Sequence, residues 1–567
     1  MPTRAEAIAL LTSPGQPFAL TEIDEPNRPG GRWRVYEHAP ATMADVLRGT
    51  AAHGDTDYIV FEGERLTYAE HLNLCAGLAG YLASIGVEAG DRVAVGMRNY
   101  PEFAVGFWSA MAMGAVSVPL NAWWTGPEMV YALQDSGAKV LFLDDERYQR
   151  LAPHLDELPD VIATIVCRSR AGLPDSVTTW ETLCATFPAE TSLPDVSIAP
   201  DDLASIMYTS GTTGFPKGAM QSHRNHITNI FNSILSGAAG AIAAGVTPAA
   251  GDAPPRQQAF FSMFPFFHIG GMSALNLAPA TGMRLVTLYK WDLDKAIDAL
   301  VAEHVTSMAV VPMLYRQILD SARVHELSPD VLGGIASGGA PVPPDLITRT
   351  ESQFDAKVAP ANAYGLTETT SGVVTNAGGD YFAHPDSVGR PVPGADIRIV
   401  RPDDGEDQPN GEIGEIWVHG PNVVSGYWNN EAATAASFTD GWFHTGDLGY
   451  VGDDGFVYVV DRLKDVVIRG GENVYCAEVE AALFLHPDVA DVAVIGLPDQ
   501  SLGEEVVAVV ERRAGSDIDA VDLQRFAAER LARFKVPSTV VFRDKPLPRN
   551  ATGKILKRDL RDELVAK

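Results

Sequence analysis

The sequence predicts an α/β protein with a large N-terminal domain and a small C-terminal domain. Its 567 residues exceed the roughly 250–300 at which a single hydrophobic core stops growing, so more than one domain is expected. Helical periods alternate with short Val- and Ile-rich runs through most of the chain, which is typical of layered α/β subdomains. Residues 389–460 instead contain short strands separated by Gly, Asp and Asn, which indicates a β-rich subdomain. We expect an N-terminal domain at residues 1–463 and an α+β C-terminal domain at residues 464–567.

Local patterns predict the individual elements. A helix should begin after Asp292, a suitable N-cap, because Leu293 and Ile297 then share one apolar face. Residues 236–256 are rich in Gly, Ala and Pro and predict a surface loop. Further helices are expected at 477–484 and 521–533, and strands at 91–95, 139–143, 307–311, 414–418, 455–459 and 492–495.

One uncharged run, residues 103–120, is about as long as a membrane helix. It contains Gly106, Gly114 and Pro119, and it changes into an alternating Val-Ser-Val pattern. These features favour a buried helix followed by a buried strand, so no membrane span is predicted.

Composition limits the partners and the location. The formal net charge of −30 disfavours binding to nucleic acid or to an anionic membrane. The four cysteines are far apart and form no C-x-x-C pair, so neither a zinc site nor a disulfide framework is indicated. No signal peptide or peroxisomal signal is recognisable, and a cytoplasmic location is expected.

The most informative segment is residues 209–218, Thr-Ser-Gly-Thr-Thr-Gly-Phe-Pro-Lys-Gly, which follows a short apolar run. Dense glycines and hydroxyls let backbone N–H groups approach phosphate oxygens, and Lys217 supplies charge. A Walker loop needs a glycine directly before its lysine. Here Pro216 precedes Lys217 and no Gly-Lys-Ser/Thr follows, so this is not a Walker loop. A P-loop ATPase or kinase is therefore disfavoured.

This loop resembles the phosphate loop of the acyl-adenylate-forming superfamily, which includes acyl-CoA synthetases, peptide-synthetase adenylation domains and luciferases. Five more segments resemble motifs of that family, in its order: Ser-Gly-Gly-Ala-Pro at 337–341, Tyr-Gly-Leu-Thr-Glu at 364–368, Thr-Gly-Asp at 445–447, Asp-Arg-Leu-Lys-Asp at 461–465 and Pro-Arg-Asn-Ala-Thr-Gly-Lys at 548–554. Six ordered motifs exclude coincidence, and the acyl-CoA synthetase branch is the best match.

The resemblance implies a two-step reaction. A carboxylate attacks the α-phosphate of MgATP to give acyl-AMP and pyrophosphate, and the CoA thiol then displaces AMP. The catalytic residues implied are Lys554, which would bridge carboxylate and α-phosphate, Thr367 at the α-phosphate, Glu368 as the Mg²⁺ ligand, and Lys217. The ATP- and AMP-binding residues implied are Thr209, Ser210, Gly211, Thr212, Thr213, Gly214, Lys217, Gly338, Gly339, Ala340, Asn362, Ala363, Tyr364, Gly365, Thr367, Asp447, Arg462 and Lys554.

The family uses one site for both steps by rotating its C-terminal domain, so that domain is expected to be mobile. Lys464 matches the hinge, and Gly470 and Gly471 resemble the face that admits CoA.

Residues 264–271, Phe-Pro-Phe-Phe-His-Ile-Gly-Gly, resemble the segment that lines the acyl tunnel in relatives. The acyl-pocket residues implied are His268, Phe267, Gly270, Gly271 and Leu366, with the two glycines leaving room for a tail. A core role for His268 stays open. His223 and His226 lack a carboxylate or Cys companion and are interpreted as an ordinary helix face.

The expected substrates are ATP, CoA and a hydrophobic carboxylic acid. A medium- or long-chain fatty acid is favoured, and an aryl or other bulky acid is the alternative. The aromatic-His segment has no Asp to pair with an α-ammonium, which disfavours amino acids. An acyl-AMP ligase for a carrier protein, a luciferase-like oxygenase and, last, a non-catalytic nucleotide or acyl-CoA sensor stay open, as does a homodimer.

Overall fold

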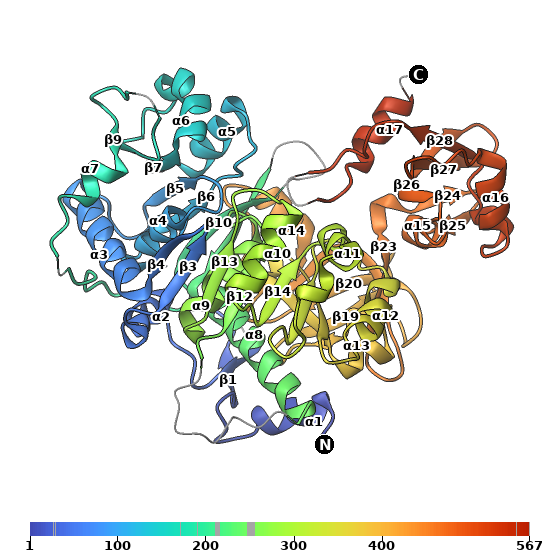
Figure 1. Ribbon diagram of the computed structural model, residues 1–567, viewed down its shortest axis with the longest axis horizontal. Helices are drawn as coiled ribbons and strands as arrows, with labels where there is room; N and C mark the ends of the chain where they lie inside the picture. Colours follow the sequence, from blue (N-terminus) through green and yellow to red (C-terminus); the bar gives the residue numbers. More distant parts are fainter. Residues whose placement is uncertain are drawn as a thin grey trace.

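The predicted α/β class with a large N-terminal and a small C-terminal domain is confirmed. The computed structural model describes residues 1–26, 28, 30–170, 172–189, 191–209, 216–245, 256–550 and 553–565. Figure 1 shows the large domain as layers of sheets and helices, with the small C-terminal domain, orange to red, at one side.

Two mostly parallel sheets form the centre of the large domain. The first has the order β18 (Arg390–Pro391), β17 (Ser371–Ala377), β16 (Ala359–Leu366), β15 (Gly334–Ser337), β14 (Ser307–Val310), β12 (Ala259–Ser262), β13 (Arg284–Thr287), β3 (Asp57–Phe61) and β4 (Glu64–Thr67). The second has the order β11 (Lys217–Ser222), β10 (Leu203–Thr209), β6 (Val116–Pro119), β5 (Arg92–Gly96), β7 (Ala138–Asp144), β8 (Ala163–Cys167) and β9 (Thr178–Thr179). The expected strands at 91–95, 139–143 and 307–311 correspond to β5, β7 and β14.

Buried helices fill the space beside these sheets. They include α3 (Tyr68–Ser84), α4 (Pro101–Ala112), α8 (His223–Ala243) and α9 (Ile269–Thr281), whose apolar residues share one core with strands of both sheets. The uncharged run forms α4 followed by β6, as predicted, and every residue of α4 except Glu102 is buried. No helix in the described ranges is long and apolar enough to cross a membrane.

The prediction of a loop at 236–256 is wrong for residues 236–243, which continue α8. Ser222 caps this helix in a capping box with Asn225, and Leu235 and Ala239 are buried on its apolar face. Ala is the best helix former, and burial of this apolar face adds further stability. Together they outweigh the cost of the scattered glycines in the helix. Residues 246–255 lie outside the described ranges. Asp292 caps α10 (Leu293–Ala302) as expected, accepting a hydrogen bond from Lys295 N at 3.1 Å.

A third sheet follows in the β-rich part and leads toward the C-terminal domain. It contains β19 (Asp396–Val400), β20 (Gly414–His419), β22 (Trp442–Val451), β21 (Phe438–Thr439) and β23 (Val457–Arg462). These strands overlap the range predicted for the β-rich subdomain; the exact domain boundaries stay a prediction.

The C-terminal domain has its own sheet, covered by three helices. The strands are β24 (Val467–Arg469), β25 (Glu472–Val474), β26 (Val489–Asp499), β27 (Gly503–Arg512) and β28 (Thr539–Arg543), and the helices are α15 (Cys476–Phe484), α16 (Ala520–Ala528) and α17 (Lys557–Val565). Helix α16 ends at Ala528, before the predicted residue 533, and a separate 3-10 turn forms at Arg533–Lys535.

Candidate active site

Several of the predicted nucleotide residues that the structure describes lie at or just beyond strand ends of the two large sheets: Thr209 ends β10, Gly338–Ala340 follow β15, and Tyr364–Thr367 lie at the end of β16. Ligands of open α/β sheets bind at the carboxyl ends of the strands. Asn99, which follows β5, joins the two edges: its Nδ2 donates to Phe264 O at 3.0 Å, and its Oδ1 accepts from Phe266 N at 2.9 Å. This buried amide holds the aromatic-His segment of one sheet against the loop of the other.

The expected phosphate loop connects β10 to β11. Thr209 and Lys217 are register partners at the loop end of this hairpin, and Thr209 Oγ1 donates to Lys217 O at 3.4 Å. The intervening predicted residues Ser210, Gly211, Thr212, Thr213 and Gly214 lie outside the described ranges. The Lys217 ammonium lies 4.9 Å from the centre of the Tyr427 ring, a cation–π distance that fixes the direction of the lysine.

Tyr427 also contacts the predicted metal ligand. Its hydroxyl donates to Glu368 Oε1 at 2.7 Å, and Glu368 is 9% exposed. Burial raises the pKa of Glu368, while the Tyr427 hydrogen bond and the charges of Arg462 and Lys217 act in the opposite direction. Glu368 follows β16, and Gln221 of β11 fixes the neighbouring backbone by donating from Nε2 to Thr367 O at 2.9 Å.

A single buried carboxylate fits Mg²⁺ that arrives with a nucleotide. No group of three or more His, Cys, Asp or Glu able to hold a metal occurs in the described part of the chain. Mg²⁺ keeps several waters and is usually bound by one or two carboxylates together with substrate phosphates. The donor set at Glu368 agrees with that mode, in which the ion neutralises phosphate charge.

The predicted ribose site is a hydrogen-bonded triad. Asp447 of β22 accepts from the Tyr364 hydroxyl at 2.8 Å and pairs with Arg462 Nε at 2.6 Å, its register partner on β23. Burial raises the pKa of Asp447, opposed by the Arg462 charge and the Tyr364 hydrogen bond. Tyr364 therefore has its ring held at the end of β16 by a carboxylate from the third sheet.

The predicted adenine turn lies beside this triad. Ser337, the last residue of β15, is paired with Asn362 in the middle of the parallel strand β16, so the turn Gly338–Ala340 emerges next to Ala363. A side chain on Gly338 would meet Ala363 O at 3.2 Å, and Gly339 has a φ of +76°. Gly365 is at a β-bulge where a Cβ would lie 1.8 Å from Ser371 O. Only glycine fits these positions without backbone movement.

Lys554 reaches this region from the C-terminal domain. Partial enclosure and then the Arg462 guanidinium lower the pKa of Lys554 to about 8, although the carboxylates of Asp447 and Asp465 act in the opposite direction. The Lys554 side chain is nevertheless exposed, and the neighbouring Gly553 lines the cavity described next. The pKa of Lys464, the predicted hinge, is also lowered, first by partial enclosure and then by the positive charge of Arg462.

A cavity of about 360 Å³ lies between the two domains. Its walls combine aromatic, cationic and aliphatic side chains, and the C-terminal lysine loop closes one side. The lining includes Arg98, Trp123, Phe264, Phe267, Tyr289, Trp291, Asn550 and Gly553. The ring centres of Trp123 and Phe267 are 5.3 Å apart, edge to face, and the Arg98 guanidinium carbon lies 4.0 Å from the centre of the Trp123 ring.

The structure brings only Phe267 of the five predicted acyl-pocket residues to this cavity. His268 instead caps α9, accepting from Gly270 N at 3.2 Å, and burial lowers its pKa to about 4. A Cβ on Gly271 would lie 2.1 Å from Pro265 O, so close backbone packing requires this glycine. Leu366 packs against the apolar cluster of the β-rich part.

The predicted CoA-side glycines form a tight turn in the C-terminal domain. Gly470 and Gly471 join β24 to β25 with φ values of +62° and +86°, the left-handed conformation of a two-residue hairpin. His223 and His226 are buried rather than on an open helix face: His223 Nδ1 accepts from Met43 N, and His226 contacts Ser205 Oγ. Both histidines are hydrogen-bonding core residues.

The sequence motifs did not reveal four residues of the site: Asn99, Gln221, Tyr427 and Trp123. Each acts through a contact distant in sequence, and Asn99, Gln221 and Trp123 belong to no recognisable pattern. The only signal available was the Val-Ser-Gly-Tyr-Trp run at 424–428, whose Tyr427 pairs with Ala219 in an isolated bridge.

Comparison with known proteins identifies the class. Residues 47–428 match the AMP-binding enzyme family, and residues 478–554 match the AMP-binding enzyme C-terminal domain. The chain belongs to the AMP-binding enzyme family. The predicted enzyme class, an AMP-forming acid–thiol ligase that uses ATP, Mg²⁺ and CoA, is confirmed at this level.

Proteins similar to this chain are named for different carboxylic acid substrates. A feruloyl-CoA synthase from an Amycolatopsis species is 38% identical over 532 residues, 94% of this chain and 98% of that protein. The long-chain-fatty-acid–CoA ligase FadD13 of Mycobacterium tuberculosis is 34% identical over 507 residues, 88% of this chain and 94% of that protein. The O-succinylbenzoate coenzyme A synthetase (MenE) of Bacillus subtilis, solved with ATP and magnesium ion, superimposes with a TM-score of 0.75 at 30% identity, covering 92% of this chain and 100% of that one.

Proposed function

We propose that the protein activates a compact aromatic carboxylic acid as its adenylate and transfers the acyl group to CoA. One observation carries this proposal: the aromatic walls at Trp123 and Phe267 and the lysine loop at Asn550 and Gly553 line the same cavity. An acid held against those rings would have its carboxylate directed toward the loop that carries Lys554.

The residues divide the work of the first step by charge. Lys217 and the loop after Thr209 hold the departing pyrophosphate, and Glu368 would hold Mg²⁺ together with the phosphates, whose charge the ion would neutralise. Tyr364 stacks on adenine, and Asp447 with Arg462 binds the ribose hydroxyls. The Lys554 ammonium contacts both the carboxylate and the α-phosphate, and its charge stabilises them most as these two anions approach each other. Rotation about Lys464 then replaces this loop with the Gly470–Gly471 face for thioester formation.

The cavity favours an aromatic over a long alkyl acid. The expectation of a fatty acid rested on space behind Gly270 and Gly271, but a Cβ at these positions would meet Phe264 at 3.1 Å and Pro265 O at 2.1 Å. Edge-to-face and stacked contacts with Trp123 and Phe267 suit a flat ring. The feruloyl-CoA synthase relative supports the same choice.

A fatty acid is the second candidate, supported by the FadD13 relative. A panel of acids containing ferulate, benzoate, decanoate and palmitate, assayed with ATP and Mg²⁺, distinguishes the aromatic-acid assignment from the fatty-acid assignment. Pyrophosphate release measures activation, and thioester formation is then scored with free CoA and with a phosphopantetheinyl carrier protein. We expect aromatic acids to give the highest kcat/KM with CoA. Higher values for decanoate and palmitate would refute the aromatic assignment, and thioester with the carrier alone would refute the CoA ligase.

A further inference from the structure

A second cavity lies beneath the first helix, and it shares no lining residue with the cavity between the domains. Its volume is about 150 Å³. It is enclosed by α1 (Arg4–Leu11), by α8, and by the paired strands β17 and β18, so segments from three distant parts of the sequence form its walls.

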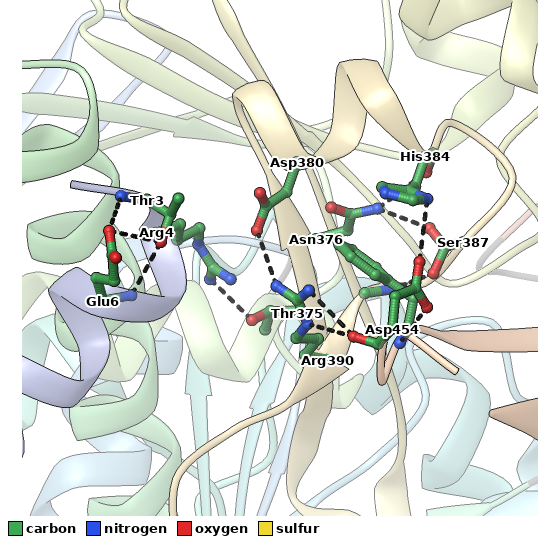
Figure 2. A network of polar contacts seen from close by, with 12 residues as sticks. Thr3, Arg4, Glu6, Thr375, Asn376, Asp380, His384, Ser387, Arg390 and Asp454 are labelled. Carbon is green, nitrogen blue, oxygen red and sulfur yellow. Dashed lines mark hydrogen bonds and ion pairs between the residues drawn. The ribbon is translucent and has the colours of Figure 1, made fainter. Parts of the chain in front are cut away.

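Two guanidinium groups and one carboxylate line this cavity. Arg4 is 7% exposed, and its terminal nitrogen donates to Ser236 Oγ at 2.8 Å and Thr375 Oγ1 at 2.9 Å. Arg390 NH1 lies 3.7 Å from Asp380 Oδ2. Figure 2 shows the Arg4 side chain extending from α1 toward Thr375, with Asp380 and Arg390 on the far side. The lining therefore carries one more positive charge than negative.

Two buried donors on this lining have no acceptor among the described residues: Arg4 Nε and Asn232 Nδ2. Asn232 is 4% exposed, and its Oδ1 already accepts from the Tyr36 hydroxyl at 2.5 Å. A buried donor without an acceptor is destabilising, by roughly 1–3 kcal/mol in typical cases. An acceptor oxygen entering beside them would remove that deficit.

The rest of the lining is apolar. Ala5 and Ile8 come from α1, Leu235 from α8, and Val392 from the segment after β18. A volume of about 150 Å³ is large enough to hold a benzene ring. The size and the walls therefore suit a small ring or a short branched chain.

We propose that this cavity is a binding site for a small monocarboxylate with an apolar body, separate from the active site. A single carboxylate balances the excess positive charge of Arg4 and Arg390 over Asp380. A dianionic phosphate would exceed that charge, face Asp380 and leave the apolar walls in contact with polar oxygen. Charge-assisted hydrogen bonds to the guanidinium groups hold the head, and Ile8 and Leu235 cover the body. This site is independent of the acid that the active site uses.

The test uses 4-fluorobenzoate, followed by ¹⁹F line broadening as the full-length protein is added. The variant Ala5→Leu fills the cavity from an exposed helix position that favours Leu, and Ala9→Leu places the same side chain on α1 outside the lining. Arg390→Gln removes one charge. The wild type and the three variants all retain the active site, so line broadening caused by binding there is the same in all four proteins. The component of the broadening that differs between them reports on this cavity.

We expect Arg390→Gln to weaken this component about tenfold or more, the effect of losing one charge-assisted contact. Ala5→Leu should weaken it at least as much because its side chain occupies the cavity, and Ala9→Leu should match the wild type. Benzoate should displace the probe better than acetate, and inorganic phosphate should not displace it. Superimposable titrations for Ala5→Leu and the wild type would overturn the proposal, provided their thermal melting curves agree. Displacement by phosphate as effective as by benzoate would also overturn it.

Discussion

The hydroxyl of Tyr427 donates to Glu368 Oε1 at 2.7 Å, while the same tyrosine ring lies under the Lys217 ammonium. One side chain thus positions both the predicted metal ligand and the predicted phosphate-binding lysine. Burial raises the pKa of Glu368, and the Tyr427 hydrogen bond lowers it, so this contact helps keep the carboxylate ionised.

Tyr427→Phe keeps the ring under Lys217 and removes only the hydrogen bond. The pKa of Glu368 should then rise further, and because the ionised form is lost as pH falls through the pKa, the acidic limb of pyrophosphate release should move to higher pH. We expect activity at neutral pH to fall about ten- to 150-fold, the usual range for one hydrogen bond to a charged group. Pyrophosphate release against pH and Mg²⁺ concentration checks this. Tyr450→Phe, which removes a hydroxyl with no contact to Glu368, is the control; an unchanged acidic limb in Tyr427→Phe would contradict the assignment.

How far the sequence predicts this site depends on where the contacts come from. Tyr364, Asp447 and Arg462 belong to motifs, and strand pairing between β22 and β23 then brings two of them together. Tyr427 and Asn99 act through contacts between segments far apart in the chain, which no local pattern encodes. The same limit applies to residues 236–243, where Gly and Ala indicated a loop but burial of Leu235 and Ala239 favoured a helix. His268 was placed in the correct segment, yet its ring caps α9 instead of facing the cavity.

Lys554→Ala should separate the two half-reactions. The lysine is needed where the carboxylate and the α-phosphate approach, and loss of such a group typically lowers the rate about 10²–10³-fold. Thioester formation from supplied acyl-AMP should be retained, because the C-terminal domain then presents its Gly470–Gly471 face. Single-turnover assays of each half-reaction measure this. Equal losses in both steps would contradict the proposed division.

The pKa of Lys554, lowered to about 8, predicts an alkaline limb in the rate of adenylation. The ammonium is present below this pH and is lost above it, so kcat/KM for adenylation should fall as the pH rises through about 8. Bound ATP adds negative charge beside the lysine, so the limb in kcat should lie at higher pH. Lys554→Arg, whose charge persists, should lose the limb even if its rate is lower. A limb that survives unchanged in Lys554→Arg would assign it to another group, with Lys464 the next to test.

Gly365→Ala should damage both stability and nucleotide binding. A Cβ would lie 1.8 Å from Ser371 O, so β16 and β17 must separate at the bulge that positions Tyr364. We expect a loss of about 1–3 kcal/mol in the free energy of unfolding, as for other overpacked sites, and a higher KM for ATP. Gly80→Ala, inside α3 with no atom within 4 Å of the new Cβ, is the matched control and should stabilise by about 0.5–1 kcal/mol. Denaturant melts and ATP titrations distinguish the two, and equal stability of both variants would refute the packing argument.

Trp123 should discriminate between acids. Its ring lies edge to face with Phe267, 5.3 Å between centres, and the Arg98 guanidinium lies over it. Trp123→Leu keeps an apolar side chain but removes the aromatic contacts, which contribute about 0.5–1.5 kcal/mol beyond area burial, or roughly two- to tenfold in affinity. We expect kcat/KM for ferulate to fall by about this factor while that for decanoate changes little, and Trp123→Phe to restore most of the ferulate rate. Parallel pyrophosphate-release assays with the two acids measure the ratio. If Trp123→Leu lowered both values equally, Trp123 would support the fold of the cavity without selecting its acid.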